Sequence, residues 1–238
     1  MTSIELSDIL PVSRLRNRRA ASRPEGNEGA RRLLNVAVAG VGLVVTAPLM
    51  LLIAGLVKLT SPGPVFYTQL RVGLDRRNPM LPTGNSRRSV NHGGRPFKIY
   101  KFRTMVVDQP NPDSQVWASR NDPRITAVGR VLRRYRLDEL PQLFNVLRGD
   151  MNVVGPRPEQ PEIFQNLREQ VERYHERQRV RPGITGWAQV NQSYDTCVED
   201  VRRKVAYDLE YVMRQSLTED LRIMLRTAPV MLFKRGAF

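Results

Sequence analysis

The sequence predicts an α+β protein that is mostly helical, with a small β-hairpin or sheet, an N-terminal re-entrant membrane helix and amphipathic interfacial helices. Three observations predict this class. An uncharged apolar run fills residues 33–57. Apolar residues elsewhere recur mainly at helical spacing. Only short segments rich in β-branched and aromatic residues interrupt that pattern.

The composition is that of one domain with appendages, because 238 residues can bury a sizeable core. The formal net charge is +15, and most of the positive charge is arginine. Arginine suits bidentate contact with phosphate, so nucleic acid, anionic lipid and phosphorylated substrates are the candidate partners. The single cysteine, Cys197, excludes an intrachain disulfide, and without any cluster of Cys and His we do not expect a zinc site.

Residues 1–32 contain seven arginines among Pro, Gly, Ser and Asn, with little apolar periodicity. This composition predicts a disordered basic arm. Because an apolar segment follows directly, anionic lipid headgroups are its expected partner. A tail that serves only solubility is the alternative.

Residues 33–60 are predicted to form the membrane helix. Its uncharged part would be about 37 Å long as a helix, enough to cross a hydrocarbon core of about 30 Å. Pro48, near the middle, opposes a straight helix. Basic residues flank both ends, so a simple span would export one basic cluster. We therefore expect the helix to enter the membrane, break at Pro48 and return.

Three other interpretations of this segment compete with the re-entrant helix. A kinked helix that spans the membrane agrees with the sequence almost as well as a re-entrant helix does. A buried core helix of a soluble protein is disfavoured, because the uncharged run is so long. A cleaved signal peptide is unlike this segment, because the preceding basic region and the apolar run are both too long.

Two strands are predicted after this helix, at residues 65–69 and 97–105. The polar residues 74–96 between them are expected to form a flexible loop. Lys101 and Arg103 share one face of the second strand, where they either present cations to a common ligand or form a solvated surface.

Residues 133–150 place Asp138 and Glu139 directly after a cluster of arginines. The apolar spacing predicts a helix that begins near Asp138, with Pro141 in its first turn and Gly149 at its end. At or near the N-cap, Asp138 would be ionised, or a phosphate would bind there. In the simpler interpretation, Asp138 only caps the helix and the arginines are solvated.

The remaining chain alternates short helices with turns that are fixed by Pro and Gly. Pro156 and Pro158 would hold the Arg157 guanidinium in one direction, and the loop at 181–187 combines Arg181 with Trp187. The other predicted elements are a basic helix at 128–135, a strand at 151–154, a surface helix at 162–179, a helix at 200–213, and an amphipathic helix at 217–235 that either lies in the membrane interface or packs on the core.

Four motifs together resemble the bacterial sugar transferases, the monotopic phosphoglycosyl transferases that begin the assembly of exopolysaccharides, O-antigens and glycoprotein glycans. They are FKIYKFRTM at 97–105, LDELPQLFNVLRGDM at 137–151, VGPRP at 154–158 and RPGITGWAQVN at 181–191. The resemblance runs from about residue 33 to the C-terminus. With no large N-terminal membrane domain in view, it implies the minimal catalytic form, residues 61–238 being the catalytic domain.

The resemblance implies transfer of a sugar phosphate from a UDP-sugar to undecaprenyl phosphate, with release of UMP and dependence on Mg²⁺. It also implies a ping-pong course through a covalent phosphosugar on Asp138. The helix break in well-known members is a Ser-Pro pair, which corresponds here to Ala47 and Pro48. Lys101 and Asp208 match family positions.

The residue types agree with this chemistry. A carboxylate attacks a diphosphate only when cations neutralise the phosphates first. We therefore predict Asp138 as nucleophile and Mg²⁺ ligand, and Glu139 as metal partner or as base for the polyprenol phosphate. The candidates for substrate phosphate contact are Arg133, Arg157, Arg181, Lys101 and Asp208.

The expected location is the cytoplasmic face of the bacterial inner membrane, with UDP-sugar, undecaprenyl phosphate and anionic headgroups as partners. We expect no nucleic-acid partner, and a homo-oligomer is compatible with the sequence. A non-enzymatic protein that binds lipid, nucleic acid or polymer by charge is the main alternative, and it gives no reason for two adjacent acids in a basic stretch. A multi-spanning phosphoglycosyl transferase is the other, for which one apolar segment is too few.

Overall fold

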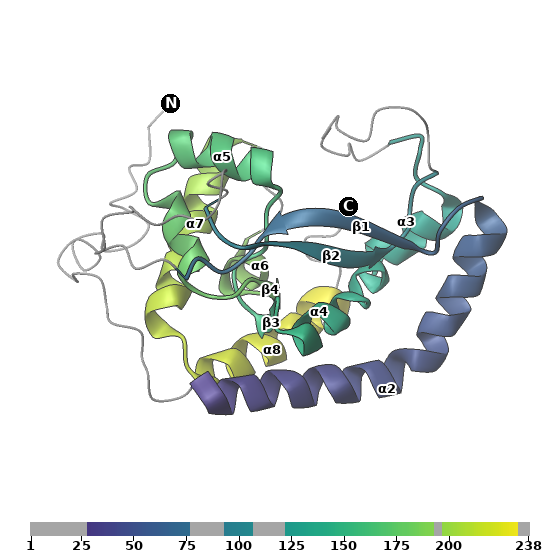
Figure 1. Ribbon diagram of the computed structural model, residues 1–238, viewed down its shortest axis with the longest axis horizontal. Helices are drawn as coiled ribbons and strands as arrows, with labels where there is room; N and C mark the ends of the chain where they lie inside the picture. The colour runs from purple at the N-terminus through teal and green to yellow at the C-terminus, as the bar shows by residue number, and fades with distance from the viewer. Residues whose placement is uncertain (1–27, 77–92, 107–121, 193–196, 233–238) are drawn as a thin grey trace.

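The computed structural model describes residues 28–76, 93–106, 122–192 and 197–232, and it confirms a mostly helical protein with a small β component. A long helix, α2, runs along one side, and the remaining elements lie in the angle that it makes (Figure 1). The helices are α2 (Glu28–Thr60), α3 (Ala127–Arg134), α4 (Gln142–Arg148), α5 (Pro161–Gln170), α6 (Trp187–Asn191), α7 (Val198–Arg214) and α8 (Leu217–Leu232), with 3₁₀ turns η3 (Leu137–Glu139) and η4 (Tyr174–Arg179).

α2 changes direction sharply part-way along its length (Figure 1). Pro48 lies inside the helix, and the Thr46 hydroxyl donates a hydrogen bond of 2.7 Å to the Gly42 carbonyl oxygen. Both features bend helices, since proline removes a backbone donor and the hydroxyl competes for a carbonyl. The helix begins at Glu28, so residues 28–32, predicted to belong to the basic arm, are its first turns; residues 1–27 lie outside the described residues.

Most of the apolar surface of α2 is not covered by the described part of the chain. Only 17% of the most apolar 18-residue stretch of α2 is buried, and Val44 and Leu51 are more than 70% exposed. By length and composition the helix could cross a membrane. The alternative of a buried core helix is therefore wrong, because a core helix would be covered on most of its surface.

Two small sheets support the body. β1 (Phe66–Val72) pairs antiparallel with β2 (Pro96–Phe102), and β3 (Asn152–Val154) pairs parallel with β4 (Gly183–Thr185). The predicted strands at 65–69, 97–105 and 151–154 are confirmed with shifted ends, whereas β4 was predicted as a loop. Of the predicted flexible loop at 74–96, residues 77–92 lie outside the described residues.

Arg103 follows β2 and does not share a ligand-binding face with Lys101. It is 5% exposed and donates hydrogen bonds to the carbonyl oxygens of Ser61 (2.7 Å) and Pro62 (2.6 Å), just beyond the end of α2. The same guanidinium approaches the Val57 carbonyl oxygen in the last turn of α2 (3.4 Å), where a cation suits the helix end because its last carbonyls have no partner inside the helix.

The core consists of several apolar clusters, two of which use α2. The first half of α2 packs through Ala39 on a cluster with Phe97 and Val146, while Ile53 in its second half packs on a cluster with Phe102. α4 lies against the first half of α2. The clusters also contain Ile99, Met151, Val57 and Leu132.

The predicted surface helix at 162–179 is wrong in two respects. The chain divides into α5 and η4, with Arg173 between them in the left-handed region (φ 60°). Phe164 and Tyr174 are fully buried and join a cluster with Val201 of α7. The high charge of this segment hid its buried face.

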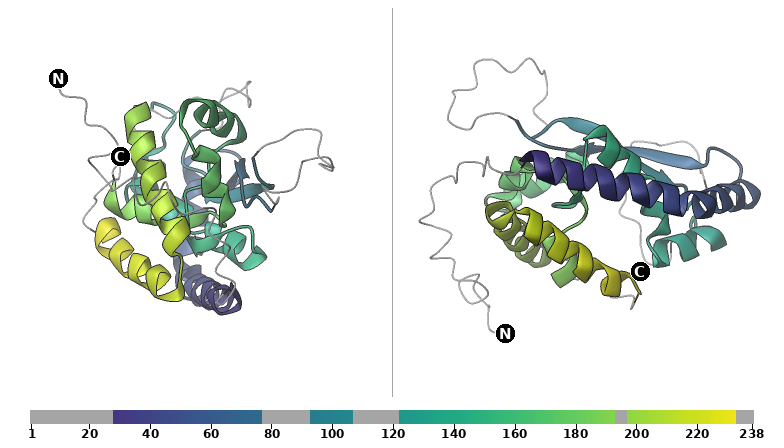
Figure 2. Two further views of the ribbon diagram at one scale, coloured as in Figure 1. Left: turned by 90° about the vertical axis from the view of Figure 1, so that its left-hand side faces the viewer. Right: turned by 90° about the horizontal axis from the view of Figure 1, so that it is seen from below.

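α8 and the first half of α2 lie along the same side of the molecule (Figure 2). One face of α8 packs on the core, with Ile223 fully buried and a hydrogen bond of 2.8 Å between the hydroxyls of Thr227 and Thr185. Leu225 on the opposite face is 76% exposed. Core packing therefore accounts for one face only, and residues 233–235 of the predicted helix lie outside the described residues.

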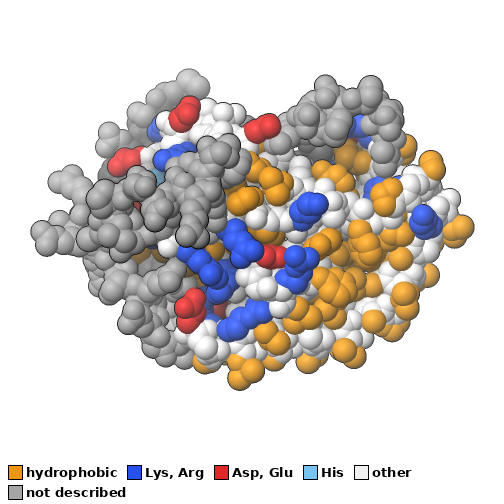
Figure 3. All heavy atoms as spheres, viewed as in Figure 1, with side chains coloured by type: hydrophobic (Ala, Val, Ile, Leu, Met, Phe, Trp, Pro, Cys, Tyr) orange, Lys and Arg blue, Asp and Glu red, His pale blue; other side chains and the backbone are white. Residues whose placement is uncertain are grey.

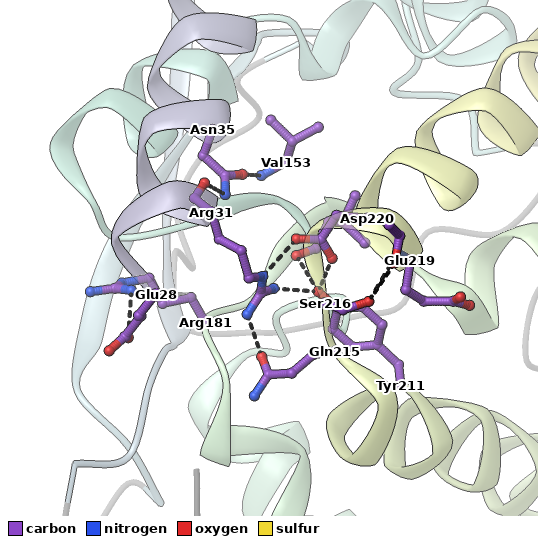
Figure 4. A network of polar contacts seen from close by, with 12 residues as sticks. Glu28, Arg31, Asn35, Val153, Arg181, Tyr211, Gln215, Ser216, Glu219 and Asp220 are labelled. Atoms are coloured by element: carbon purple, nitrogen blue, oxygen red, sulfur yellow. Dashed lines mark hydrogen bonds and ion pairs between the residues drawn. The ribbon is translucent and has the colours of Figure 1, made fainter. Parts of the chain in front are cut away.

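A buried polar network fastens the start of α2 to α7 and α8 (Figure 4). The Arg31 guanidinium donates to Asp220 (2.8 Å), to the Tyr211 hydroxyl (2.8 Å) and to Gln215 (2.6 Å). Tyr211 in turn donates to Asp220 (2.7 Å), whose side chain is 2% exposed. Removing one partner of such a buried ion pair leaves an uncompensated charge.

We expect Arg31→Met to lower the free energy of unfolding by about 3 kcal/mol, because it leaves the Asp220 carboxylate buried with only Tyr211 as a donor among these residues. Thermal unfolding in detergent micelles would measure the change. Lys58→Met removes an exposed cation at the other end of the same helix and should change stability by less than about 0.5 kcal/mol. Equal effects of the two variants would contradict this role of Arg31.

Candidate active site

Charged side chains from three segments converge around Glu139. Lys101 comes from the end of β2, Asp138 and Glu139 form η3, and Arg157 follows β3. Arg136, directly before η3, has φ 54°, and this left-handed turn redirects the chain from α3 into η3. The structure therefore brings the four sequence-predicted residues together, with Arg136 beside them.

Glu139 is only 6% exposed and is shared by two cations. Lys101 Nζ lies 2.9 Å from Oε1, and Arg157 Nη2 donates to the same oxygen at 2.6 Å. Arg136 is 4.0 Å from the other oxygen. Burial alone would raise the pKa of Glu139, but the charges of Arg157 and Lys101 hold that pKa well below its ordinary value. Glu139 is therefore ionised and paired.

Asp138, next to Glu139 in the chain, is also buried, with 8% of its surface exposed. Unlike Glu139, it has no close cationic partner in the described part of the chain. No described residue donates a hydrogen bond to its carboxylate. Burial raises the pKa of Asp138 to about 6, and the charge of Glu139 adds to the rise, while Lys101 and Arg157 oppose it. Near neutral pH this carboxylate is ionised and lacks a close partner among the described residues.

The prediction that Asp138 lies at or near a helix N-cap is wrong. α4 begins at Gln142 with Pro141 as its N-cap, and Asp138 lies in the preceding 3₁₀ turn. Gly149 ends α4 with φ 83°, as predicted. The ionisation of Asp138 is thus governed by burial and neighbouring charges, and not by a helix terminus.

The cations of the site outnumber its carboxylates. Burial lowers the pKa of Lys101, and the charge of Glu139 counteracts this. Arg133, on α3, donates to the Thr104 hydroxyl (2.9 Å), and its charge lowers the pKa of Asp138. Lys101, Arg133, Arg136 and Arg157 stand against two acids, so the site has an excess of positive charge that suits a diphosphate.

Asp208 lies behind the site and is fully paired with an arginine that the sequence did not single out. Arg177 is 0% exposed, and its Nε lies 2.7 Å from Asp208 Oδ2. The same guanidinium donates to the Arg157 carbonyl oxygen at 3.1 Å. Asp208 is therefore linked to Arg157 through Arg177, and its carboxylate pairs with a buried guanidinium.

Arg181 lies away from Asp138. Its Nε donates to the carbonyl oxygen of Gly149, at the end of α4 (3.2 Å), and its Nη1 lies 3.4 Å from Glu28. Asp138 precedes the other end of α4, and the seven residues of that helix rise by about 10 Å. Asp138 and Arg181 both lie in the four motifs that resemble the family, yet the fold places them at opposite ends of α4.

Arg136 and Arg177 are the residues of this region that sequence reasoning did not select. Arg136 is one of the arginines that precede Asp138 in the sequence. Its left-handed backbone conformation, which places its side chain 4.0 Å from Glu139, is visible only in the structure. Arg177 is one of several arginines in 162–179, and nothing in its spacing distinguished it. Both assignments needed the tertiary structure.

We expect Asp138→Asn to raise the free energy of unfolding by about 2 kcal/mol at pH 7.5 in EDTA, because it removes a buried charge. The folded pKa of about 6 lies above the ordinary value of 3.8, so folded protein binds more protons between these values and loses stability as pH rises through this range. The gain should therefore vanish near pH 4. Thermal unfolding across pH would measure it.

Glu139→Gln provides the contrast for this prediction. It leaves Lys101 and Arg157 without their shared carboxylate, so it should lower stability at pH 7.5. A gain from Asp138→Asn that is equal at pH 4 and pH 7.5 would show that its buried charge is not the cause.

Comparison with known proteins places this geometry in a family. The family model described as bacterial sugar transferase matches residues 26–234. The chain is 41% identical over 213 residues to an undecaprenyl-phosphate glucose phosphotransferase of Komagataeibacter xylinus, covering 87% of this chain and 37% of that protein. It is 40% identical over 207 residues to a UDP-N-acetylgalactosamine-undecaprenyl-phosphate N-acetylgalactosaminephosphotransferase of Aeromonas hydrophila, covering 87% and 44%.

A third relative has a similar length. The chain is 37% identical over 236 residues to the exopolysaccharide production protein ExoY of Rhizobium meliloti, covering 92% of each. This chain thus spans less than half of the first two relatives and nearly all of the third. Because the family model and a relative of matching length agree, the chain belongs to the bacterial sugar transferase family.

Proposed function

We propose that this chain is a phosphoglycosyl transferase that moves a sugar 1-phosphate from a UDP-sugar to undecaprenyl phosphate, releases UMP and initiates an exopolysaccharide- or lipopolysaccharide-type glycan. The names of the relatives supply the substrate classes. The single observation that carries the proposal is Asp138, a buried carboxylate with no described hydrogen-bond donor, surrounded by an excess of cations.

The cations make attack by a carboxylate feasible. Asp138 and the diphosphate of a nucleotide sugar repel each other, so their charges must be balanced before they meet. Lys101, Arg133 and Arg157 are close enough to Asp138 to affect its pKa, so they are near the position that the phosphates would occupy. Arginine can bind phosphate oxygens through two parallel N–H groups.

In the first half-reaction, an oxygen of Asp138 attacks the phosphorus that bears the sugar. A bond forms between that oxygen and phosphorus, the bridging bond of the diphosphate breaks, and UMP leaves with the bridging oxygen. Because the pKa of Asp138 is raised to about 6, its carboxylate is ionised at pH 7 to 8. The carboxylate is also more basic than that of an ordinary aspartate.

In the second half-reaction, a phosphate oxygen of undecaprenyl phosphate attacks the same phosphorus, and the bond to Asp138 breaks. A phosphate monoester has a second pKa of about 6, so near pH 7.5 the acceptor is already a dianion and needs no base. Glu139 suits a base poorly, because its pKa is held well below the ordinary value. We assign Glu139 to orienting Lys101 and Arg157.

The residues present fit a Mg²⁺ ion shared with the substrate. Mg²⁺ is commonly held by one or two carboxylates together with substrate phosphates and water. Within the described ranges no three acidic, His or Cys side chains gather into a metal cage, and the Asp138 carboxylate has no described donor. Asp138 would hold the ion, with Glu139 adjacent; when bound, Mg²⁺ neutralises charge on the diphosphate.

The bent α2 supports a re-entrant position in the cytoplasmic face of the inner membrane. Its exposed apolar surface would enter the bilayer around Ala47 and Pro48, and its basic ends, at Arg32 and Lys58, would stay near anionic headgroups. The exposed face of α8, with Leu225, would rest in the interface on the same side. Residues 61–238 form the catalytic domain in this proposal.

Release of UMP tests the reaction. Incubated with a UDP-sugar and Mg²⁺ but no lipid, the chain should release up to one equivalent of UMP and carry the sugar phosphate as a covalent label. Asp138→Asn should abolish both, because the amide cannot form the acyl phosphate. UMP detection and intact-protein mass spectrometry provide the two readouts.

Asp200→Asn is the matched control, since it makes the same chemical change on α7, outside the site, and should leave both readouts unchanged. Labelling that survives in Asp138→Asn would refute the nucleophile assignment. Release of UMP only when polyprenol phosphate is present would instead indicate a direct transfer.

The position of α2 in the membrane can be tested with single cysteines, because the chain has only Cys197, which Cys197→Ser removes. In this background, Gly29→Cys and Thr60→Cys lie near opposite ends of α2. A re-entrant helix places both on the cytoplasmic side, so an impermeant maleimide should label both in inverted membrane vesicles and neither in intact spheroplasts.

Replacement of the proline provides the control. Pro48→Leu restores a backbone donor and favours a straight helix, so it should expose one end to the outside in part of the population. Labelling of one end from outside in the Pro48-containing background would show a simple span.

A further inference from the structure

A second cationic site lies at the far end of α4 from Asp138. Arg76, Arg95 and Arg181 line a small, open pocket together with Gly73, Phe97 and Gly149. Arg76 follows β1 and Arg95 precedes β2 at the same end of that strand pair, and Arg181 precedes β4, so two separate parts of the fold bring guanidiniums to one pocket. Gly149 lines the pocket where it ends α4, in the left-handed region (φ 83°) that favours glycine.

The positive charge of this pocket is only partly balanced. Among the described residues, Asp150 in the pocket wall pairs with the exposed Arg148 (3.4 Å). Arg181 pairs with Glu28, whose side chain is 64% exposed, so solvent weakens that interaction. The side chains of Arg76 and Arg95 have no hydrogen bond or ion pair with another described side chain.

The neighbouring positive charges affect the pKa of Arg181. Burial lowers the pKa of Arg181, Glu28 counteracts the change, and the charges of Arg76 and Arg32 lower the pKa further. When a protein holds several positive charges close together without an equal number of acids, the charges repel one another. Binding of an anion reduces this repulsion.

The pocket is a different place from the Asp138 site. Arg181 contacts Gly149, which ends α4, whereas Asp138 precedes the start of that helix. None of Lys101, Arg133 and Arg157, the cations that affect the pKa of Asp138, lines the pocket. An anion bound here would therefore not be the one that Asp138 attacks.

The pocket also adjoins the start of α2, the helix that enters the membrane in the function proposed above. Arg32, in the first turns of α2, donates to the carbonyl oxygens of Val146 (2.6 Å) and Leu147 (2.7 Å), so the basic start of α2 adjoins the end of α4. Figure 3 shows Lys and Arg side chains gathered near the middle of one face, beside a broad apolar surface toward α2. In the membrane position proposed above, a cationic pocket next to the start of α2 would lie near the lipid headgroups.

We propose that Arg76, Arg95 and Arg181 form a phosphate-binding site distinct from the Asp138 centre, which takes the phosphate of a membrane lipid headgroup or of a soluble phosphate compound. Phosphate matches the site because guanidiniums from several directions can each donate two N–H groups to its oxygens. Binding should weaken as ionic strength rises, because two of these arginines are exposed to solvent.

Calorimetric titration of the full chain in nonionic detergent tests this site. The probes are dihexanoyl phosphatidic acid, dihexanoyl phosphatidylcholine and inorganic phosphate. Arg95→Gln should weaken phosphatidic acid binding about tenfold, as expected for loss of a charge-assisted hydrogen bond, and Arg76→Gln with Arg95→Gln should remove that binding event. Arg168→Gln, an exposed arginine on α5, is the matched control and should change affinity less than about twofold.

The probes also distinguish the source of the phosphate. Tighter binding of phosphatidic acid than of inorganic phosphate indicates a lipid headgroup, and equal affinity indicates a soluble phosphate. Phosphate binding that is unchanged in the double variant overturns the site. Loss of single-turnover UMP release in Arg95→Gln would place the pocket within the catalytic centre and overturn its independence, whereas failure of the proposed reaction would leave the titration result unaffected.

Discussion

Glu139 shares one carboxylate between Lys101 and Arg157, and the arrangement of the candidate active site depends on that sharing. The two cations come from the end of β2 and from the turn after β3, segments that are far apart in the sequence. A buried carboxylate with two cations within 3 Å holds them in fixed positions and stays ionised. Because Glu139 takes both close contacts, Asp138 beside it remains a buried carboxylate with no described donor and a raised pKa.

A second buried ion pair supports the first. Arg177 and Asp208 are both almost fully buried, and Arg177 also donates to the carbonyl oxygen of Arg157. The backbone that carries the Arg157 guanidinium is thus held from behind, while its side chain reaches Glu139 in front. This arrangement gives Asp208 a physical role in positioning, without contact with the reacting atoms.

Arginines also join α2 to the rest of the molecule. Arg31 binds the carboxylate of Asp220 (Figure 4). Arg32 binds the last carbonyls of α4, and Arg103 binds carbonyls just beyond the end of α2. These contacts act together with the apolar packing of the inner face of α2 through Ala39 and Ile53. The high arginine content of the chain therefore has a structural use besides any contact with phosphate.

The sequence by itself determined the helical class, three of the four strands in the described part of the chain, the apolar helix with its proline, and the family. These follow from local periodicity, turn residues and contiguous motifs, which do not depend on distant contacts. Only the tertiary structure decided that Arg157 and Lys101 meet at Glu139, that Asp208 faces Arg177, and that Arg181 lies at the opposite end of α4. The physical reason is that an arginine looks the same in sequence whether it pairs with a buried acid, caps a helix or faces solvent, and the choice is made by packing between segments far apart in the chain.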